Sequence, residues 1–364
     1  MHVSPATDAG ELVGCCRRAE VAPATGMKRA TASVRLDVHA VIATHAGGPE
    51  VLSSVTQPDP SPGPHEALVR VAAAGVNFID TYRRAGVYPV PYPHVPGSEG
   101  SGTIVAVGEQ VTGFAPGDRV AWSAAPGSYA ELVVVPEREL LAVPDGVDDE
   151  TAAALLLQGL TAHYLVTSTF PVEPGATVLV HAGAGGVGLL LTQLATQRGG
   201  HVIATVGSVE KEALARAAGA RDVIRYRELG DLTTDLPAQV RRLTDGRGVD
   251  AVYDGVGRDT FDASLASLAR RGMLVLFGAS SGPVPPVDPQ RLNAAGSLFL
   301  TRPTLGHYVA DRSELEWRAG ELFRAVADGR LDVRIGARFP LSAAADAHRA
   351  LESRSTTGKV LLLP

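Results

Sequence analysis

A short stretch in the middle of the chain, residues 177–188, constrains the fold more than any other. A β-branched apolar run over 177–180 leads into Gly183-x-Gly185-x-x-Gly188, and an amphipathic helical pattern follows. Strand, glycine turn and helix in this order form the first unit of a dinucleotide-binding fold. The glycines allow the tight turn, let a pyrophosphate approach the backbone and let helix and strand pack closely. The motif therefore predicts a helix N-terminus whose N–H groups face the phosphates of a dinucleotide.

The pattern along the chain changes at about residue 151. Residues 38–150 contain short apolar runs between Pro- and Gly-rich turns, which is typical of a small, partly open β-barrel. From residue 151, strand and helix patterns alternate, as in a doubly wound parallel sheet. Strands are predicted at 177–181, 201–206, 222–226, 250–254, 272–278, 297–300 and 359–363, and helices at 210–218, 259–270, 314–327 and 343–353, the segments after 301 returning to the first domain.

Composition excludes several classes of protein. The 364 residues carry a net charge of −6, so no broad basic surface for nucleic acid is expected. No apolar run approaches the roughly 18 residues that span a membrane; the longest, 152–166, contains Gln158 and His163 and is predicted to be a buried helix. The cysteines, Cys15 and Cys16, are adjacent, which predicts no disulfide framework and favours a reducing cytoplasm.

Ten segments, in order from about residue 38 to the C-terminus, resemble the zinc-free quinone oxidoreductases of the medium-chain dehydrogenase/reductase superfamily, which include zeta-crystallin. The resemblance implies a GroES-like, partly open β-barrel catalytic domain over 37–160 and 301–364. It also implies a Rossmann NADPH-binding domain over 161–300 and a homodimer. Residues 1–36 lack periodicity and are predicted to be a disordered extension. The segments are HAGGPEVL (45–52), GVNFIDTY (75–82), PGSEGSGTIVAVG (96–108), GDRVAW (117–122), QGLTAHYL (158–165), HAGAGGVG (181–188), YDGVGRDT (253–260), FGASSG (277–282), TRPTL (301–305) and ESRSTTGK (352–359).

The residue types at two positions argue against a metal. The zinc alcohol dehydrogenases resemble this chain, but they have a Cys where Asn77 stands and a His where Ser98 stands. An amide and a hydroxyl replace the thiolate and the imidazole, so a catalytic zinc lacks its ligands. No cysteine lies beyond residue 16, which leaves no ligands for a four-thiolate structural zinc. The sequence therefore predicts no metal.

The choice of cofactor is indicated at the end of the second Rossmann strand. NAD-selective folds usually carry an acid about 20 residues past the glycine loop. Here that place holds Gly207 and Ser208, and Lys211 follows closely. Without a carboxylate there is no repulsion, and an ammonium attracts a 2′-phosphate. NADPH is therefore predicted, although Lys211 taken alone is also consistent with a solvated helix lysine. The resemblance adds Tyr226 and Arg354 around the phosphate.

By family position, Asn77, Tyr82, Tyr88 and Thr161 are the predicted catalytic residues near the nicotinamide. Tyr and Asn side chains offer neutral donors for a quinone oxygen. The alternative for Tyr82 and Tyr88 is packing beside the Pro-rich turn, and Asp80 in the same segment is expected either at the cleft or in helix capping. The resemblance places the cofactor contacts at Asn77, Thr161, Gly183, Gly185, Gly186, Val187, Gly188, Gly207, Ser208, Lys211, Tyr226, Phe277, Ser280 and Arg354.

No nucleophile or tuned acid–base pair stands out, which suits transfer of a hydride or electrons from NADPH to a quinone without a metal. An NADPH-dependent enone or enoyl-thioester reductase is the alternative enzyme, because hydride delivery to a conjugated alkene needs similar machinery. A non-catalytic NADPH- or RNA-binding protein is a third possibility, against which the acidic charge and the retained Asn77 and Tyr82 argue. Ala279 stands where close relatives often have Asn, so a polar contact near the nicotinamide is missing, and the sequence does not decide between a quinone and an enone as the substrate.

Overall fold

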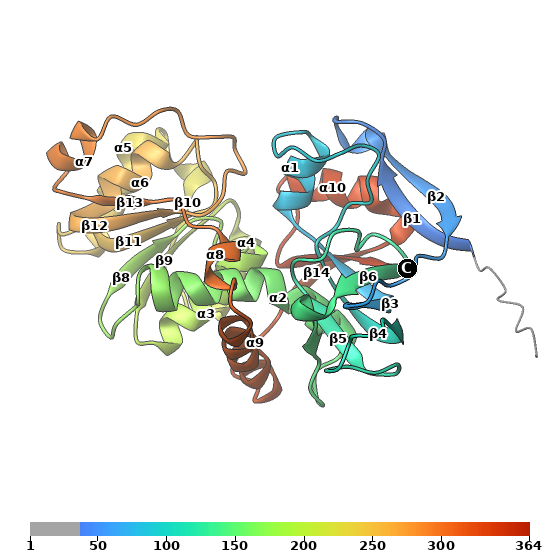
Figure 1. Cartoon of the computed structure of the whole chain (residues 1–364). Coiled ribbons are helices and arrows are strands. Elements are labelled where there is room, and N and C mark those ends of the chain that lie inside the picture. Colours follow the sequence, from blue (N-terminus) through green and yellow to red (C-terminus); the bar gives the residue numbers. More distant parts are fainter. Residues whose placement is uncertain (1–36) are drawn as a thin grey trace, which may run out of the picture. The chain divides into compact units, whose positions relative to one another are not determined.

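The computed structural model describes residues 37–364. The predicted extension over 1–36, with Cys15 and Cys16, lies outside the described residues. Six parallel strands form one sheet in the order β10-β9-β8-β11-β12-β13 (Figure 1). The strand order reverses between β8 and β11, which is the switch point where ligands of such sheets bind. The strands are β8 (Thr177–Val180), β9 (His201–Val206), β10 (Asp222–Arg225), β11 (Val249–Asp254), β12 (Leu268–Leu276) and β13 (Phe299–Thr301).

The two faces of this sheet bury different helices, because side chains alternate along each strand. Leu179 and Val252 pack in one hydrophobic cluster with residues of α5 and α6. Val178 and Tyr253 pack in another with residues of α2, α3 and α9. We call this sheet with its helices the parallel lobe. Its helices are α2 (Asp149–Tyr164), α3 (Gly186–Gln197), α4 (Val209–Ala217), α5 (Leu232–Leu243), α6 (Phe261–Ser267), α7 (Gln290–Ala294), α8 (Leu305–Tyr308) and α9 (Arg312–Ala327).

One predicted helix boundary is wrong. The sequence pattern predicts a helix over 259–270, but α6 ends at Ser267, and β12 begins at once with Leu268. Leu268 leaves the helix because it pairs with Val249 of β11 and packs, 2% exposed, in the cluster under the sheet. A register shift along this strand pair and a positive φ of 63° at Arg271 accommodate the abrupt change. Tertiary pairing here overrides local helix propensity.

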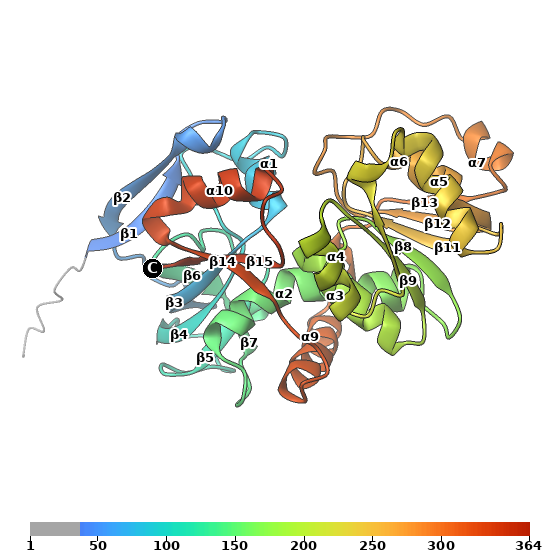
Figure 2. The ribbon, with the colours of Figure 1, turned by 180° about the vertical axis from the view of Figure 1, so that it is seen from behind.

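A second, mainly antiparallel sheet is built from both ends of the described chain. Its order is β14-β15-β3-β4-β5-β7, β6 also pairs with β3, and β1 and β2 form a separate hairpin. Figure 2 shows the C-terminal segment, β15 and α10, beside the early strands. We call these elements the antiparallel lobe: β1 (Asp37–Ala43), β2 (Leu52–Pro58), β3 (Glu66–Val76), α1 (Phe78–Arg84), β4 (Glu99–Val107), β5 (Arg119–Trp122), β6 (Leu132–Pro136), β7 (Leu141–Ala142), β14 (Ile335–Pro340), α10 (Ala344–Glu352) and β15 (Lys359–Leu363).

The predicted fold class, a partly open β-barrel with a doubly wound parallel sheet, is confirmed. The residue boundaries of the two domains stay a prediction. β13 runs to Thr301, and Leu322 of α9 packs in the same cluster as the parallel sheet. No helix within residues 37–364 combines the length and the apolar character needed to cross a membrane.

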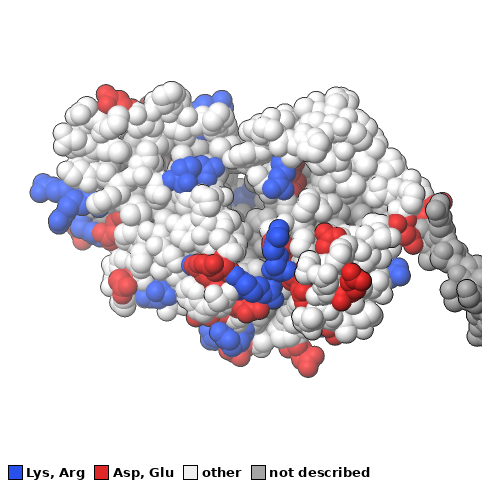
Figure 3. Space-filling model, viewed as in Figure 1, with Lys and Arg blue, Asp and Glu red and all other residues white. Residues whose placement is uncertain are grey.

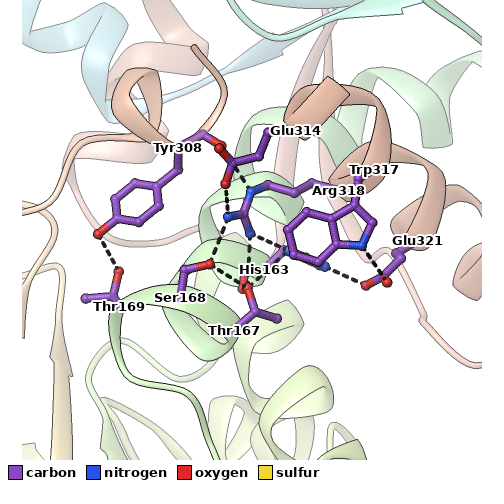
Figure 4. Close-up of polar contacts among 9 residues, drawn as sticks. All are labelled: His163, Thr167, Ser168, Thr169, Tyr308, Glu314, Trp317, Arg318 and Glu321. Atoms are coloured by element: carbon purple, nitrogen blue, oxygen red, sulfur yellow. Dashed lines mark hydrogen bonds and ion pairs between the residues drawn. The ribbon is translucent and has the colours of Figure 1, made fainter. Parts of the chain in front are cut away.

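A polar cluster around the buried side chains of Arg318 and His163 ties α9 to the end of α2 (Figure 4). Arg318 is 1% exposed, and it donates to His163 Nδ1 at 2.9 Å and to Ser168 Oγ at 2.8 Å while pairing with Glu314. His163 Nε2 in turn lies 2.8 Å from a carboxylate oxygen of Glu321. The guanidinium thereby holds the short π-helical turn that follows α2 against α9. We call these five residues the α9 cluster.

Candidate active site

A pocket of about 320 Å³ opens at the carboxyl ends of the parallel strands, at the switch point between β8 and β11. It is lined by the glycine loop, the end of β9 and, from the antiparallel lobe, Asn77. Figure 3 shows a hollow on this side of the molecule with Lys or Arg side chains at its rim. The predicted site residues that line the pocket are Asn77, Gly185, Gly186, Val187, Gly188, Gly207, Lys211, Tyr226, Phe277, Ser280 and Arg354.

The glycine loop brings its backbone close to the pocket for steric reasons that differ between positions. A Cβ at Gly188 would contact the carbonyl oxygen of Ala182 and lie 3.0 Å from Gly183 Cα. A Cβ at Gly186 would meet only the end of the Gln158 side chain. Gly188 is therefore required for the close packing of α3 on the turn, and Gly186 leaves room for a neighbouring flexible side chain. The first N–H groups of α3 lack intrahelical partners and face this pocket.

The end of the pocket near β9 is cationic. Lys211 Nζ donates to the backbone oxygen of Arg354 at 2.7 Å. Burial and then the charge of Arg227 lower the pKa of Lys211. A Cβ at Gly207 would lie 2.9 Å from Tyr226 Oη and 3.4 Å from Arg227 Nε, so both side chains flank that glycine. Sequence reasoning missed Arg227, although its position directly after Tyr226 was a signal. This corner suits a phosphate better than a bare ribose.

Three predicted cofactor residues lie outside the pocket lining. The hydroxyl of Thr161 donates to the carbonyl of Leu157, at 2.7 Å, within α2. Ser208 caps α4, its hydroxyl accepting from the backbone N–H of Lys211 at 3.3 Å. Gly183 packs below the loop, where a Cβ would lie 2.8 Å from that of Ala204. Their direct role in binding stays a prediction.

The two predicted catalytic tyrosines lie together on α1 and the loop after it, also outside the pocket lining. The ring centroids of Tyr82 and Tyr88 are 6.0 Å apart, and Tyr88 is 42% exposed. Burial raises the pKa of Tyr82, and a hydrogen bond with the Ala279 backbone partly offsets this effect. Tyr82 therefore reaches from α1 to the loop after β12, and its hydroxyl stays protonated, and hence a donor, at neutral pH.

Asn77 follows β3, and its side-chain amide is held on both sides. Nδ2 donates to Glu99 Oε2 at 2.8 Å, and Oδ1 accepts from Lys359 Nζ at 2.9 Å. Gln158 also donates to Oδ1, at 3.4 Å. Glu99 and Lys359 form an ion pair and are 0% and 1% exposed. We call these four residues the Asn77 cluster. Sequence reasoning assigned no role to its other three members, although each of them lies in one of the segments that resemble the family.

The residues at the two zinc-ligand positions of the alcohol dehydrogenases do not fit a metal. The hydroxyl of Ser98 accepts from the Arg83 guanidinium at 2.5 Å and donates to Asp80 Oδ1 at 3.2 Å. A guanidinium at this place repels a cation, and the amide of Asn77 is already engaged. Within residues 37–364, no group of three or more His, Cys, Asp and Glu side chains is arranged to hold a metal ion.

Asp80 begins a buried chain of polar groups that runs away from the pocket. Its Oδ2 accepts from the backbone N–H of Asn77 at 2.9 Å, which is a helix-capping contact, and from Tyr129 Oη at 3.3 Å. Tyr129 Oη lies 3.1 Å from His348 Nε2, and Arg84 donates to His348 Nδ1 at 3.0 Å. Burial raises the pKa of Asp80 to about 6 and lowers that of His348 to about 3. His348 is therefore neutral at neutral pH.

Two family models match the chain. The alcohol dehydrogenase GroES-like domain matches residues 63–145, and the zinc-binding dehydrogenase model matches residues 186–321. A quinone oxidoreductase of Pseudomonas aeruginosa is 47% identical over 320 residues, covering 87% of this chain and 97% of the relative. A 2-haloacrylate reductase of a Burkholderia species is 40% identical over 336 residues, covering 90% of this chain and 99% of the relative.

Solved structures agree with these matches. A mycobacterial protein in complex with NADPH is 55% identical, with a TM-score of 0.86, over 90% of this chain and 100% of that chain. The Escherichia coli quinone oxidoreductase in complex with NADPH is 41% identical, with a TM-score of 0.87 over the same shares. From the similarity along nearly the whole length of these relatives, and from the two matching lobes, we conclude that the chain belongs to the quinone oxidoreductase family of the medium-chain dehydrogenase/reductase superfamily.

Proposed function

We propose that this chain is an NADPH-dependent quinone reductase. The observation that carries the proposal is the pocket at the switch point, which joins the glycine loop and Lys211 of the parallel lobe to Asn77 and Arg354 of the antiparallel lobe. Relatives at 55% and 41% identity were solved with NADPH, and the Pseudomonas aeruginosa relative is a quinone oxidoreductase. NADPH is therefore the cofactor that this pocket fits.

Each group in the pocket, together with Tyr82 beside it, has one task in the proposed reaction. When bound, the nicotinamide cofactor supplies the hydride. The N–H groups at the start of α3 bind the pyrophosphate, and Lys211 and Arg354 bind the 2′-phosphate. Asn77 and the protonated hydroxyl of Tyr82 donate to the quinone oxygen on which negative charge develops. Reduction to the hydroquinone would take that hydride and one proton, and the proton would come from water.

Steady-state oxidation of NADPH with 1,4-benzoquinone tests the proposal. We expect turnover that depends on both substrates, and weaker binding of NADH than of NADPH in a direct titration. Purified protein that binds NADPH but transfers no hydride to a panel of quinones would contradict the quinone-reductase assignment. Protein that binds neither cofactor would contradict the assignment of the pocket.

Reduction of a conjugated alkene is the second candidate, favoured by the 2-haloacrylate reductase at 40% identity. The alkene carbon accepts the same hydride, and the conjugated carbonyl oxygen uses the same donors. The kcat/KM for small enones and enoyl thioesters, compared with that for 1,4-benzoquinone, separates the two activities. A higher kcat/KM for the alkenes than for 1,4-benzoquinone would show that the substrate is a conjugated alkene.

We also propose a cytoplasmic homodimer that does not bind nucleic acid. β13 lies at an edge of the parallel sheet, and its Phe299 is 56% exposed, which supports a self-association surface there. The net charge of −6 argues against RNA. Light scattering measures the oligomeric state, cell fractionation measures the compartment, and a mobility shift with AU-rich RNA tests for nucleic-acid binding.

A further inference from the structure

We propose that Glu99 and Lys359 are positioning residues for the reaction, which hold the amide of Asn77 in the orientation that offers a hydrogen to the bound reactants. The inference rests on the proposed function, because it assigns a task within that reaction. The two residues are buried and do not line the pocket, so they act through Asn77. Nothing in the sequence motifs singles them out.

The geometry arises from three neighbouring strands, β15, β3 and β4. Gly75 of β3 pairs with Glu99 on one side and with Leu361 of β15 on the other. A Cβ at Gly75 would lie 2.6 Å from Lys359 Cε and would also contact Glu99 Oε2. The missing side chain at Gly75 therefore makes room for the carboxylate and the ammonium to meet across the middle strand, directly beside Asn77.

The ion pair determines which way the amide faces. A carboxylate only accepts hydrogen bonds and an ammonium only donates them, so Nδ2 of Asn77 faces Glu99 and Oδ1 faces Lys359. The second Nδ2 hydrogen makes a long contact, 3.4 Å, with the carbonyl of Gly75. This hydrogen is the one that the amide offers to a ligand. With the amide turned over, the pocket would receive an acceptor oxygen instead.

The pair is also connected to the cofactor side of the pocket. Lys359 follows Gly358, whose N–H donates to the carbonyl of Ala184 in the glycine loop at 3.0 Å. The second oxygen of Glu99 accepts from the backbone N–H of Leu157 in α2 at 2.6 Å. Both charges are therefore anchored to elements that border the cofactor, and the position of Asn77 follows from those anchors.

A role in stability alone is the competing explanation, and it makes a different prediction. Burying two charges costs desolvation energy, and replacing such a pair by neutral groups of similar size is often neutral or stabilising. Neutralising both partners together leaves no uncompensated buried charge. If the pair serves stability alone, such a double variant keeps its activity.

The test is the double variant Glu99→Gln/Lys359→Met, compared with Glu314→Gln/Arg318→Met in the remote α9 cluster. Both replace one carboxylate–cation pair by the same kinds of neutral residue, and the cation is 1% exposed in each, although Glu314 is 32% exposed and Glu99 is 0% exposed. The first double variant should lose kcat for 1,4-benzoquinone on the order of 10- to 100-fold, the scale for small misplacements at a reacting centre. Its NADPH dissociation constant should stay near that of the wild type, and the control should keep the wild-type kcat.

Wild-type kcat in the first double variant would overturn the inference while leaving the proposed function intact, whereas an inactive wild-type protein would overturn both. Amide hydrogen exchange over residues 75–84 is a readout without turnover, and faster exchange there in the first variant but not in the control is expected. Unchanged exchange would count against the inference. If the double variant does not fold, Glu99→Asp keeps the countercharge of Lys359 and, one methylene shorter, draws the carboxylate away from Asn77 Nδ2. The same loss of kcat is expected, and wild-type kcat in this variant would count against the inference.

Discussion

The two sides of the pocket are built by different means. On the parallel-lobe side, the glycine loop contributes one continuous segment, residues 184–188, next to side chains such as Lys211 and Tyr226. On the antiparallel-lobe side, the side chain of Asn77 is held by partners from three other elements, and Lys359 is 282 residues away in sequence. The first side depends on local steric fit and the second on long-range charge pairing. We therefore call the parallel-lobe side the cofactor side and the antiparallel-lobe side the chemical side. Substitutions on the cofactor side should weaken NADPH binding, and substitutions on the chemical side should lower kcat.

The largest effect is expected from Gly188→Ala on the cofactor side. The added Cβ meets backbone atoms that cannot move away, so we expect a loss of about 1–3 kcal/mol in unfolding free energy. We also expect an NADPH dissociation constant raised on the order of 100-fold, or about 2.7 kcal/mol. Thermal unfolding and an NADPH titration measure the two changes.

Gly186→Ala and Gly306→Ala are the controls for Gly188→Ala. At position 186 the Cβ meets only the flexible end of Gln158, so a smaller loss is expected. At position 306 nothing lies within 4 Å of an added Cβ, and that variant should behave as the wild type. Equal losses at 186 and 188 would show that the loop is not limited by backbone packing.

Lys211→Ala tests the cationic end of the cofactor side. Removing one charge-assisted contact should weaken NADPH by about 1–3 kcal/mol and leave NADH nearly unchanged, because NADH has no 2′-phosphate. Titration with both cofactors measures the difference. Equal weakening of the two cofactors would remove Lys211 from the phosphate site.

Tyr82→Phe tests the chemical side, where we expect a loss of turnover without a loss of NADPH affinity. The ring stays and one donor is lost, so kcat/KM for the quinone should fall by about 1–3 kcal/mol while NADPH affinity barely changes. Tyr308→Phe, which removes a remote hydroxyl that accepts from Thr169 at 3.1 Å, is the matched control. Wild-type quinone turnover in the Tyr82 variant would place the donor elsewhere.

His348→Gln tests whether the buried chain behind Asp80 affects stability rather than rate. Burial lowers the pKa of His348 from 6.5 to about 3, so the unfolded chain takes up a proton first as the pH falls. The unfolding free energy of the wild type should therefore fall by about 1 kcal/mol between pH 6.5 and pH 5.5 because of His348. The His348→Gln variant should not show this decrease. Asp80, whose pKa is raised to about 6, acts in the opposite direction in both proteins. Denaturant unfolding across this pH range measures the difference, and identical pH profiles would contradict it.

The smallest effect is expected from a chelator. The Ser98 hydroxyl accepts a hydrogen bond from the Arg83 guanidinium, and the Asn77 amide donates to Glu99. These two positions therefore offer no set of ligands for zinc. EDTA should leave kcat for the quinone unchanged. Activity lost in EDTA and restored by zinc would show that the site was misjudged.

The contrast between the two sides also explains what the sequence could predict. The glycine loop and Lys211 are recognisable because they lie in one continuous segment, residues 183–211, and the parallel strands because each is a local apolar run. Glu99 and Lys359 meet only after three strands pair in the correct register, which no local pattern encodes. The end of α6 was misplaced for a similar reason, since Leu268 is drawn away by its partner on β11.

The late position of Lys359 has a consequence for synthesis in the cell. Glu99 and Asn77 leave the ribosome long before their lysine, which lies 260 and 282 residues further along the chain. Until Lys359 emerges, the carboxylate of Glu99 lacks its countercharge, and burying it between β3 and β4 would cost desolvation energy. The glycine loop, in contrast, has its whole segment as soon as α3 has emerged. The emergence of β15 is thus the event that allows the ion pair beside Asn77 to form.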